Sequence, residues 1–423
     1  MKVLWFANTP CGATEYLTGQ KVTGGGWLYA LSDALCTYTE IELHIAFYWH
    51  EAIDSFTHNN IEYHPVLREG SGSRLGRYWS RLNRQFSSAL DKLEIRRLQK
   101  VVEEVAPDLI HFHGSEENFG LLAESIDNKN MLLSIQGLMS PYLYKLYSGY
   151  PRAKVLRYGK LLPKLMCDGY AAYERWFSKG AMREQRILSN VNNIIGRTAW
   201  DRDCSLALNP QRKYYVCNEI LRPQFFDMSW NNTNVNDKIV LVTTVSSGLY
   251  KGLEMVYQTA RLLKTHNFNF EWNIIGVSAN DDIVRITNKI SNISHCDVNV
   301  NLLGRMEAND MLHVLLNSHI FIQVSHIENS PNSLCEAMLL GMPIVASFAG
   351  GTSSMLNDGK EGILVQDGDP YRLAGAIINM KHNFREAIMM GKASKERAKV
   401  RHNPKRVANE LITIYNEVYN AKN

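Results

Sequence analysis

The 423-residue sequence lacks the features of membrane-spanning, disulfide-bonded and nucleic-acid-binding proteins. No apolar run approaches the ~20 residues that a membrane-spanning helix needs, and the first run, Val3–Phe6, is too short for a signal peptide. The seven cysteines form no Cys-x-x-Cys pair, which favours reduced thiols. The net charge of +4 is too small to indicate nucleic acid as a partner. We therefore expect a cytoplasmic globular protein, with peripheral attachment to the inner face of the cytoplasmic membrane as an alternative.

Short apolar runs alternate with helical patterns along most of the sequence. The first series of expected strands is Val3–Phe6, Ile41–Tyr48, Leu109–Phe112, Met131–Ile135 and Asn193–Ile195. The second series is Ile239–Thr244, Phe270–Ile275, Val298–Leu303, Ile320–Val324 and Pro343–Ala346. Such alternation is typical of parallel sheets covered by helices on both faces. The sequence therefore predicts an α/β protein with two Rossmann-like lobes.

A polar, linker-like stretch around 217–236 separates the two series. We predict a first lobe over 1–218, a second lobe over 219–403 and an amphipathic C-terminal helix over 404–423. The first lobe has two inserts. One is a Gly/Ser loop at 70–76, followed by a long basic helix to about residue 105. The other, 142–186, holds ten Lys and Arg residues against three Asp and Glu.

The most informative segment, 320–346, has the pattern of a strand, a loop, a helix, a tight turn and a strand. Ser330 and Asn332 are good helix-capping residues, Pro331 suits a helix start and Gly341 suits a helix end. The helix would point its free backbone N–H groups toward the carboxyl edge of the sheet, where ligands bind in such folds. A helix N-terminus of this kind attracts phosphate.

Two acids flank this expected phosphate site. Glu336 lies in the helix and Glu328 in the loop before it, and each carboxylate can accept hydrogen bonds from sugar hydroxyls. This arrangement fits a nucleotide-sugar, with its ribose, diphosphate and hexose. The alternatives are a dipole-stabilising acid for Glu336 and a solvated loop acid for Glu328.

The Glu328-x7-Glu336 spacing, followed by Gly341-x-Pro343, resembles the signature of the retaining glycosyltransferase family that includes sucrose synthase and glycogen synthase. The resemblance covers essentially the whole chain and is strongest over 303–365. It implies the GT-B fold, in which two lobes face a central cleft and the C-terminal helix crosses back to the first lobe. In that fold 1–218 would be the acceptor-side lobe and 219–403 the nucleotide-sugar-binding lobe. It also implies that Glu336 holds the donor ribose, that Glu328 lies beside the donor sugar, and that the backbone at Ser333 and Leu334 binds the diphosphate.

Two segments of the first lobe also fit this family. A glycine-rich turn that includes Gly25 and Gly26 would lie against the donor diphosphate and the acceptor, unless it is a plain flexible turn. The dinucleotide fingerprint fails there, because its third glycine would fall at Tyr29. His113 ends a strand and matches the histidine that faces the donor sugar; the alternative is a structural role. His111 points to the same strand face, but no third ligand is visible, so we expect no metal.

Lys251, in a strand–loop–helix segment, matches the family's Lys-Gly element that binds the diphosphate; the alternative is a surface lysine. The arginine that usually precedes it by about five residues is missing, since Ser246 and Ser247 occupy that region. Arg197 and Arg305 are the candidate replacements.

The expected function is a retaining transfer of a hexose-type sugar, with Glu328, His113 and Lys251 at the reaction centre. The donor would be a UDP-sugar rather than a GDP-sugar, and no cofactor would be required. The acceptor would be a glycan or a lipid-diphosphate-linked glycan of bacterial capsule, O-antigen or exopolysaccharide synthesis. The basic insert would contact that acceptor or an anionic membrane, unless it is a solvated insertion. The alternatives are a non-catalytic subunit of the same fold and a nucleotide-sugar 2-epimerase.

Overall fold

The computed structural model describes residues 1–19, 26–70, 74–126, 130–166, 168–235 and 237–421. The chain forms two compact units, which we describe separately. Unit 1 comprises 1–143, 172–220 and 402–423, and unit 2 comprises 144–171 and 221–401. The chain therefore passes between the units at four points, two of which lie close to the predicted lobe boundaries.

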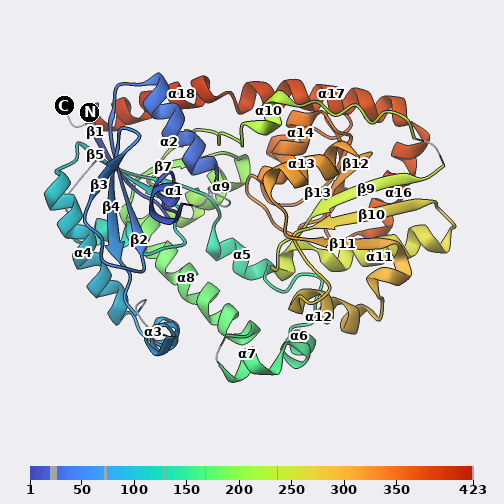
Figure 1. Ribbon diagram of the computed structural model, residues 1–423, viewed down its shortest axis with the longest axis horizontal. Helices are drawn as coiled ribbons and strands as arrows, with labels where there is room; N and C mark the ends of the chain where they lie inside the picture. Colours follow the sequence, from blue (N-terminus) through green and yellow to red (C-terminus); the bar gives the residue numbers. More distant parts are fainter. Residues whose placement is uncertain (20–25, 71–73, 127–129, 167, 236, 422–423) are drawn as a thin grey trace. The chain divides into compact units, whose positions relative to one another are not determined.

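Unit 1 is built on an eight-stranded sheet with the strand order β3-β4-β2-β1-β5-β6-β7-β8 (Figure 1). Its strands are β1 (Lys2–Phe6), β2 (Glu42–Trp49), β3 (Phe56–His58), β4 (Ile61–Leu67), β5 (Leu109–His113), β6 (Met131–Ser134), β7 (Asn193–Gly196) and β8 (Lys213–Val216). The edge strand β3 is antiparallel to β4, and the other pairings are parallel. Alternating residues of β1 enter opposite cores, with Val3 and Trp5 on one face and Leu4 and Phe6 on the other.

Helices cover both faces of this sheet, as the apolar character of its strands requires. The helices of unit 1 are α1 (Ala13–Thr18), α2 (Gly26–Tyr38), α3 (Arg74–Phe86), α4 (Ala89–Val105), η1 (Phe119–Glu124), α8 (Tyr170–Asn190), α9 (Ala199–Leu208) and α18 (Pro404–Asn420). Apolar residues of α2 and α18 pack on one face of the sheet, and those of α4 and α8 pack on the other (Figure 1). The predicted return of the C-terminal helix to the first lobe is confirmed, since Tyr415 of α18 accepts a hydrogen bond from Trp5 of β1 (2.8 Å).

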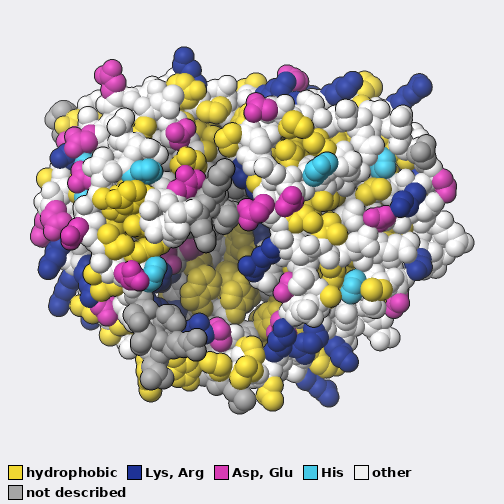
Figure 2. All heavy atoms as spheres, viewed as in Figure 1, with side chains coloured by type: hydrophobic (Ala, Val, Ile, Leu, Met, Phe, Trp, Pro, Cys, Tyr) yellow, Lys and Arg dark blue, Asp and Glu magenta, His cyan; other side chains and the backbone are white. Residues whose placement is uncertain are grey.

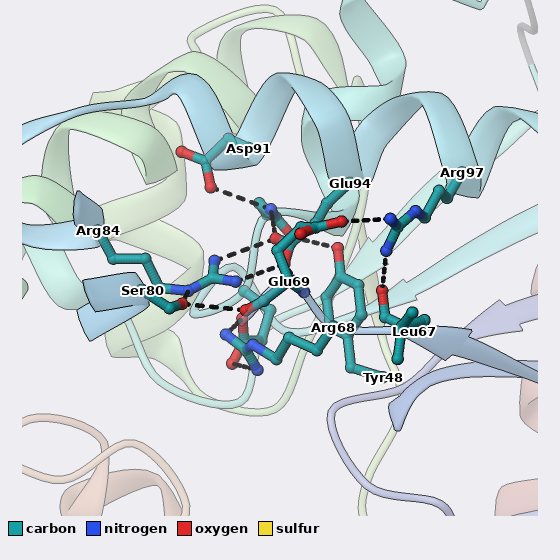
Figure 3. A network of polar contacts seen from close by, with 11 residues as sticks. Tyr48, Leu67, Arg68, Glu69, Ser80, Arg84, Asp91, Glu94 and Arg97 are labelled. Carbon is teal, nitrogen blue, oxygen red and sulfur yellow. Dashed lines mark hydrogen bonds and ion pairs between the residues drawn. The ribbon is translucent and has the colours of Figure 1, made fainter. Parts of the chain in front are cut away.

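The single long basic helix expected after the 70–76 loop is instead two helices, α3 and α4, and this prediction was wrong. Two serines, Ser87 and Ser88, separate them, and serine favours helix ends over helix interiors. A network of polar contacts holds α3 against α4 (Figure 3). At its centre, the buried carboxylate of Glu94 accepts hydrogen bonds from Arg84 of α3 (3.0 Å from Nη1) and from Asn118 (2.9 Å).

Unit 2 is built on a six-stranded parallel sheet with the order β11-β10-β9-β12-β13-β14. Its strands are β9 (Ile239–Thr244), β10 (Phe270–Ile275), β11 (Val300–Gly304), β12 (Ile320–Gln323), β13 (Ile344–Phe348) and β14 (Ile363–Gln366). From β9 the chain adds β10 and β11 on one side, and then returns to place β12 on the other side. The strand order therefore reverses between β9 and β12, and ligands bind at such a switch point in open parallel sheets.

The helices of unit 2 again cover both sheet faces (Figure 1). They are α6 (Arg152–Tyr158), α7 (Leu161–Leu165), α10 (Gln224–Asp227), η2 (Leu249–Lys251), α11 (Leu253–Thr265), α12 (Asp282–Ser291), η3 (His295–Val298), α13 (Ala308–Leu316), α14 (Asn332–Leu340), α15 (Thr352–Met355), α16 (Pro370–His382) and α17 (Phe384–Arg401). Apolar residues of α11, α12 and α16 line one core, and those of α10, α13 and α14 line the other.

The basic insert differs from its predicted assignment to the first lobe, because residues 144–171 pack with unit 2. Helix α5 (Met139–Lys145) leads into this segment. Tyr150 and Val155 are buried in the same apolar core as α11 and α12, and the Tyr150 hydroxyl hydrogen-bonds Thr287 (2.7 Å). The composition of the insert indicated its positive charge, but it did not indicate that Tyr150 and Val155 would be buried. Among the described residues, no helix has the length and apolar character needed to cross a membrane.

Candidate active site

Lys251 and Glu328 meet at the switch point of unit 2. Lys251 ends η2, in the segment that follows β9, and Glu328 lies in the loop that follows β12. The Lys251 Nζ atom donates a hydrogen bond to Glu328 Oε1 at 2.6 Å. The Glu328 side chain is 9% exposed and that of Lys251 is 23% exposed, so solvent screens this ion pair only in part.

Two glycines hold the Glu328 loop by close backbone contact. Gly252, directly after Lys251, has φ +77°, and a Cβ there would lie 2.2 Å from the carbonyl oxygen of Val324. Gly350, after β13, has φ +53°, and a Cβ there would lie 2.0 Å from the carbonyl oxygen of Glu328. Since L-residues rarely adopt positive φ and neither contact leaves room for a side chain, both positions need glycine.

Helix α14 begins beside this loop, as the sequence predicted, but its cap differs from the prediction. Pro331 is the N-cap residue, and no side chain caps the helix there. The amide of Leu334 donates to the carbonyl of Pro331 (3.0 Å), whereas the amides of Asn332 and Ser333 precede the first intrahelical bond. Gly341, at φ +82°, ends the helix in the left-handed conformation expected of a C-terminal glycine.

Glu336 is paired with Arg222, a residue that the sequence analysis did not select. Arg222 Nε and Nη2 each donate to one carboxylate oxygen of Glu336, both at 2.7 Å. Glu336 is 2% exposed, and the Arg222 side chain is 29% exposed and lies over the Phe225 ring. Burial raises the pKa of Glu336 while Arg222 opposes this shift. Each carboxylate oxygen still has a lone pair available for a ligand hydroxyl.

His326, also missed by the sequence analysis, lies between two acids beside the same loop. Its Nδ1 atom hydrogen-bonds Asp367 Oδ1 and its Nε2 atom hydrogen-bonds Glu254 Oε1, both at 2.5 Å. Glu254 is in the first turn of α11, and Asp367 follows β14. A histidine two residues before Glu328 is visible in the sequence, but nothing local there reveals its two acidic partners.

The remaining site predictions fall on both units. Arg305 directly follows β11 in unit 2 and is exposed. Arg197, the other candidate replacement for the missing arginine, belongs to unit 1, where it lies over the Trp27 ring (4.4 Å) and 3.4 Å from Glu219. Gly26 is the first residue of α2, and Gly25 lies outside the described residues.

His113 ends β5 in unit 1, beside β1, at the point where the strand order of that sheet reverses. Its side chain is 1% exposed and packs against Trp5, with 4.3 Å between ring centroids. Within the described part of the chain, neither ring nitrogen has a hydrogen-bond partner, which is rare for a buried polar group. Burial holds the pKa of His113 well below its usual value, with a smaller effect from His111, so the ring is neutral.

Within the described part of unit 1, one group of side chains lies close enough together to be considered as metal ligands: His44, Glu62 and His64 of β2 and β4. The two rings hydrogen-bond each other directly, with 3.0 Å between His44 Nδ1 and His64 Nε2. The other ring nitrogens reach Glu42 (3.0 Å) and Ser55 (2.9 Å). Hydrogen bonds therefore satisfy every ring nitrogen, and burial lowers the pKa of His64 to about 4.

Residues 236–383, about a third of the chain and all within unit 2, match the model of a family described as "Glycosyl transferases group 1". The matched segment contains Lys251, Glu328 and Glu336, and it ends before the return of the chain to unit 1.

The chain is also similar to the amylovoran biosynthesis glycosyltransferase AmsK of Erwinia amylovora, with 21% identity over 211 residues. The alignment covers 48% of this chain and 51% of the relative, so the two match over about half their lengths. Sucrose-phosphate synthase from Thermosynechococcus elongatus has a similar structure (TM-score 0.73, 15% identity, 99% of each chain). Anabaena HepE in complex with UDP and glucose is also similar (TM-score 0.63, 14% identity, 98% of each chain). These likenesses confirm the predicted GT-B fold.

Proposed function

We propose that this chain transfers a hexose-type sugar from a nucleotide diphosphate donor to a glycan or lipid-linked glycan, with retention of the anomeric configuration. The observation that carries this proposal is the meeting of Lys251 and Glu328 at the switch point of unit 2, beside the start of α14. The group 1 family match and the UDP and glucose in the HepE complex support a nucleotide-sugar donor, with UDP as the first candidate.

The diphosphate would bind between Lys251 and the first amides of α14, chiefly that of Ser333. Negative charge develops on the diphosphate as the sugar leaves, and fixed positive groups at that point stabilise the transition state. Lys251 has three N–H donors and gives one to Glu328, so two remain for phosphate oxygens. The amide of Leu334 would contribute less, because it already donates to Pro331. These groups supply positive charge from the protein itself, and we propose that transfer needs no metal cofactor.

Glu328 and Glu336 would accept hydrogen bonds from hydroxyl groups on either side of the diphosphate. Glu328 would bind the hexose, and Glu336 the ribose. Arg222 supports the second role, because two short hydrogen bonds fix the orientation of the Glu336 carboxylate. Arg305, exposed after β11, would contact the donor from the edge of unit 2.

Unit 1 would bind the acceptor. His113 supports this role, since its neutral ring can offer one donor or one acceptor nitrogen to a sugar hydroxyl, and both nitrogens lack partners within the described chain. Gly25 and Gly26 would allow the backbone before α2 to approach the ligands. The acceptor hydroxyl would attack from the face that the diphosphate leaves. The relative involved in amylovoran biosynthesis favours a bacterial exopolysaccharide as the product.

The test is a titration with UDP, GDP and their glucose conjugates, followed by incubation with the conjugate that binds. We expect binding of UDP-glucose without added metal, and release of UDP when a glycan acceptor is present. Proton NMR of the product should show the same anomeric configuration as the donor, which is the evidence for retention. Binding without any UDP release would favour a non-catalytic subunit. Conversion of the donor sugar in the absence of acceptor would favour a 2-epimerase.

We also propose that segment 144–171 contacts an anionic membrane or the diphosphate of a lipid-linked acceptor. The segment holds six Lys and Arg residues and one Asp, and Figure 2 shows dark-blue basic side chains gathered over α6. Large apolar side chains of the same segment are exposed, with Tyr144 at 91%, Leu161 at 69% and Leu162 at 67%. Basic and apolar side chains together are typical of surfaces that bind anionic bilayers. Flotation with phosphatidylglycerol vesicles tests this, because salt-sensitive binding should weaken on Arg157→Glu.

A further inference from the structure

The ring of His326 carries a positive charge in the interior of unit 2. Its side chain is 3% exposed, and both of its nitrogens hydrogen-bond carboxylates, those of Glu254 and Asp367. Since an ionised carboxylate only accepts hydrogen bonds, both ring nitrogens must donate, and the ring is therefore an imidazolium. Burial lowers the pKa of His326, but the hydrogen bonds to Asp367 and Glu254 outweigh this and raise it to about 9.

His326 joins the two segments that carry the site residues. Glu254 lies three residues after Lys251 on the same segment, and His326 lies two residues before Glu328. In addition, the backbone amide of His326 donates to the carbonyl of Tyr250, the neighbour of Lys251, at 2.8 Å. The imidazolium and its own backbone thus hold the Glu328 loop against the Lys251 segment at two points.

Segment 144–171 reaches the same cluster from outside the matched segment 236–383. Lys145 Nζ donates to Asp367 Oδ2 at 2.8 Å, so Asp367 bridges Lys145 and His326. Gly149, at φ +77°, packs so closely on Glu254 that a Cβ would lie 1.9 Å from its Oε1 atom. Two ionisable groups, Glu254 of α11 and Asp367 after β14, contact His326. Each has a further ionisable neighbour: Lys145 of α5 binds Asp367, and the phenol of Tyr150 lies close to Glu254, so that burial and Glu254 raise the pKa of Tyr150.

We propose that His326 is a positioning residue, which fixes the Glu328 loop against the Lys251 segment, and that Lys145 completes the clamp by holding Asp367. This inference rests on the proposed donor site, because it assigns His326 a role in the geometry of Lys251 and Glu328. It also gives segment 144–171 a second role, since that segment would act on the donor-binding residues through Asp367. His326 itself touches neither donor nor acceptor in this proposal.

Hydrogen exchange of peptides covering 246–254 and 324–332 tests the clamp without any ligand. In His326→Gln, both segments should exchange about 10²-fold faster, as expected when charge-assisted hydrogen bonds to a buried group are lost. Lys145→Met, a change at a 44% exposed side chain that should leave folding intact, should accelerate both segments by a few-fold. The control is His319→Gln, which removes a buried histidine that accepts a bond from the Val240 amide (2.8 Å). Unchanged exchange of the two segments in His326→Gln, relative to this control, would overturn the proposal.

Binding and kinetic measurements with UDP-glucose distinguish a failure of this proposal from a failure of the proposed function. If wild-type protein binds UDP-glucose, His326→Gln should lower kcat/KM for the donor by about 10²-fold, the loss caused by a displacement of about 1 Å in an active site. The His319→Gln control should keep kcat/KM near the wild-type value at a similar melting temperature. Equal kcat/KM in all three proteins would overturn the positioning role. Failure of wild-type protein to bind UDP-glucose would count against the proposed donor alone, and the exchange experiment would still decide the clamp.

Discussion

Replacing Arg222 with methionine should destabilise unit 2 because it removes the only cation that the structure pairs with the buried carboxylate of Glu336 within the described residues. Methionine keeps most of the apolar side-chain stem, so the packing against Phe225 is largely retained. The two 2.7 Å hydrogen bonds are lost, and Glu336, at 2% exposure, cannot exchange them for water. Breaking one partner of a buried pair costs about 3–5 kcal/mol.

The loss of stability also has an upper limit that can be worked out independently. Without Arg222, Glu336 can bind a proton and become neutral, so the loss cannot exceed the free energy of protonating it. Protonating a carboxyl of ordinary pKa, about 4.3, at pH 7 costs about 4 kcal/mol, and at pH 5 only about 1 kcal/mol. Burial already raises the pKa of Glu336 in the wild type, and losing Arg222 removes the opposing effect. When the pKa of a carboxyl is higher in the folded state than in the unfolded state, the folded protein loses stability as the pH increases. The defect should therefore be about 4 kcal/mol at pH 7 and much smaller at pH 5.

Thermal unfolding by circular dichroism at pH 5 and pH 7 measures this effect. For a unit of about 200 residues, 4 kcal/mol lowers the unfolding temperature by about 8–16 °C. Arg222→Met combined with Glu336→Gln should recover most of the loss, because no buried charge remains. A loss below about 1 kcal/mol at pH 7, an equal loss at both pH values, or no recovery in the double variant would refute the reasoning.

Three further predictions concern single side chains. Lys251→Ala should lower the rate of UDP release by about 10²–10³, whereas Lys238→Ala, which breaks an exposed ion pair, should leave it near the wild-type rate; equal rates would remove Lys251 from the site. Since the pKa of His326 is raised to about 9, its stabilising effect is complete below about pH 6.5 and is lost as pH rises to about 9. Urea unfolding should show a loss of about 3 kcal/mol over that interval in the wild type and none in His326→Gln. Glu94→Ala should lower the free energy of unfolding by about 3–5 kcal/mol, because it leaves Arg84 without its buried partner; a fall below about 1 kcal/mol in thermal denaturation would contradict that.

The central strands of both units were predictable from the sequence because they are buried on both faces. Runs such as Val3–Phe6 and Ile239–Thr244 are apolar enough to be recognised alone, and they appear as β1 and β9. The strands β3, β4, β8 and β14 were missed. All four lie at or near a sheet edge, and β3, β4 and β8 also carry polar side chains. In β4, a proline and a histidine interrupt the apolar pattern, although Ile61, Tyr63 and Val66 are buried.

The site was predictable where its residues are close in sequence and not where its partners are distant. Glu328, Ser333 and Glu336 fall within one loop and one helix, so the helix-start pattern and the resemblance to the Glu-x7-Glu family together predicted a shared role. Arg222 lies 114 residues from Glu336, and nothing in a polar linker-like stretch marks it as a partner. Glu254 likewise lies 72 residues before His326. Only tertiary packing brings the members of these pairs together, and the sequence around each residue gives no sign of its partner.

The charges of the ion-paired side chains around the proposed donor site balance, and this limits where the attraction for a diphosphate can come from. Four cations and four acids contact one another there: Lys145, Arg222, Lys251 and His326, with Glu254, Glu328, Glu336 and Asp367. Attraction for a diphosphate must then come from the N–H donors of Lys251 that Glu328 leaves available, the first amides of α14 and the exposed Arg305, rather than from an excess of positive charge among the paired side chains.

The variant Glu328→Gln tests that argument, because it removes one acid beside Lys251 and leaves the lysine charge uncompensated. UDP, which carries no hexose, should bind more tightly to this variant than to the wild type, and its affinity should depend more steeply on salt. UDP-glucose should gain less, since the proposed hexose contact of Glu328 is weakened at the same time. Isothermal titration with both ligands at 50 and 200 mM salt makes the comparison. If UDP binds Glu328→Gln no more tightly than the wild type, Lys251 does not face the diphosphate, and the cation that stabilises the leaving group must be sought elsewhere.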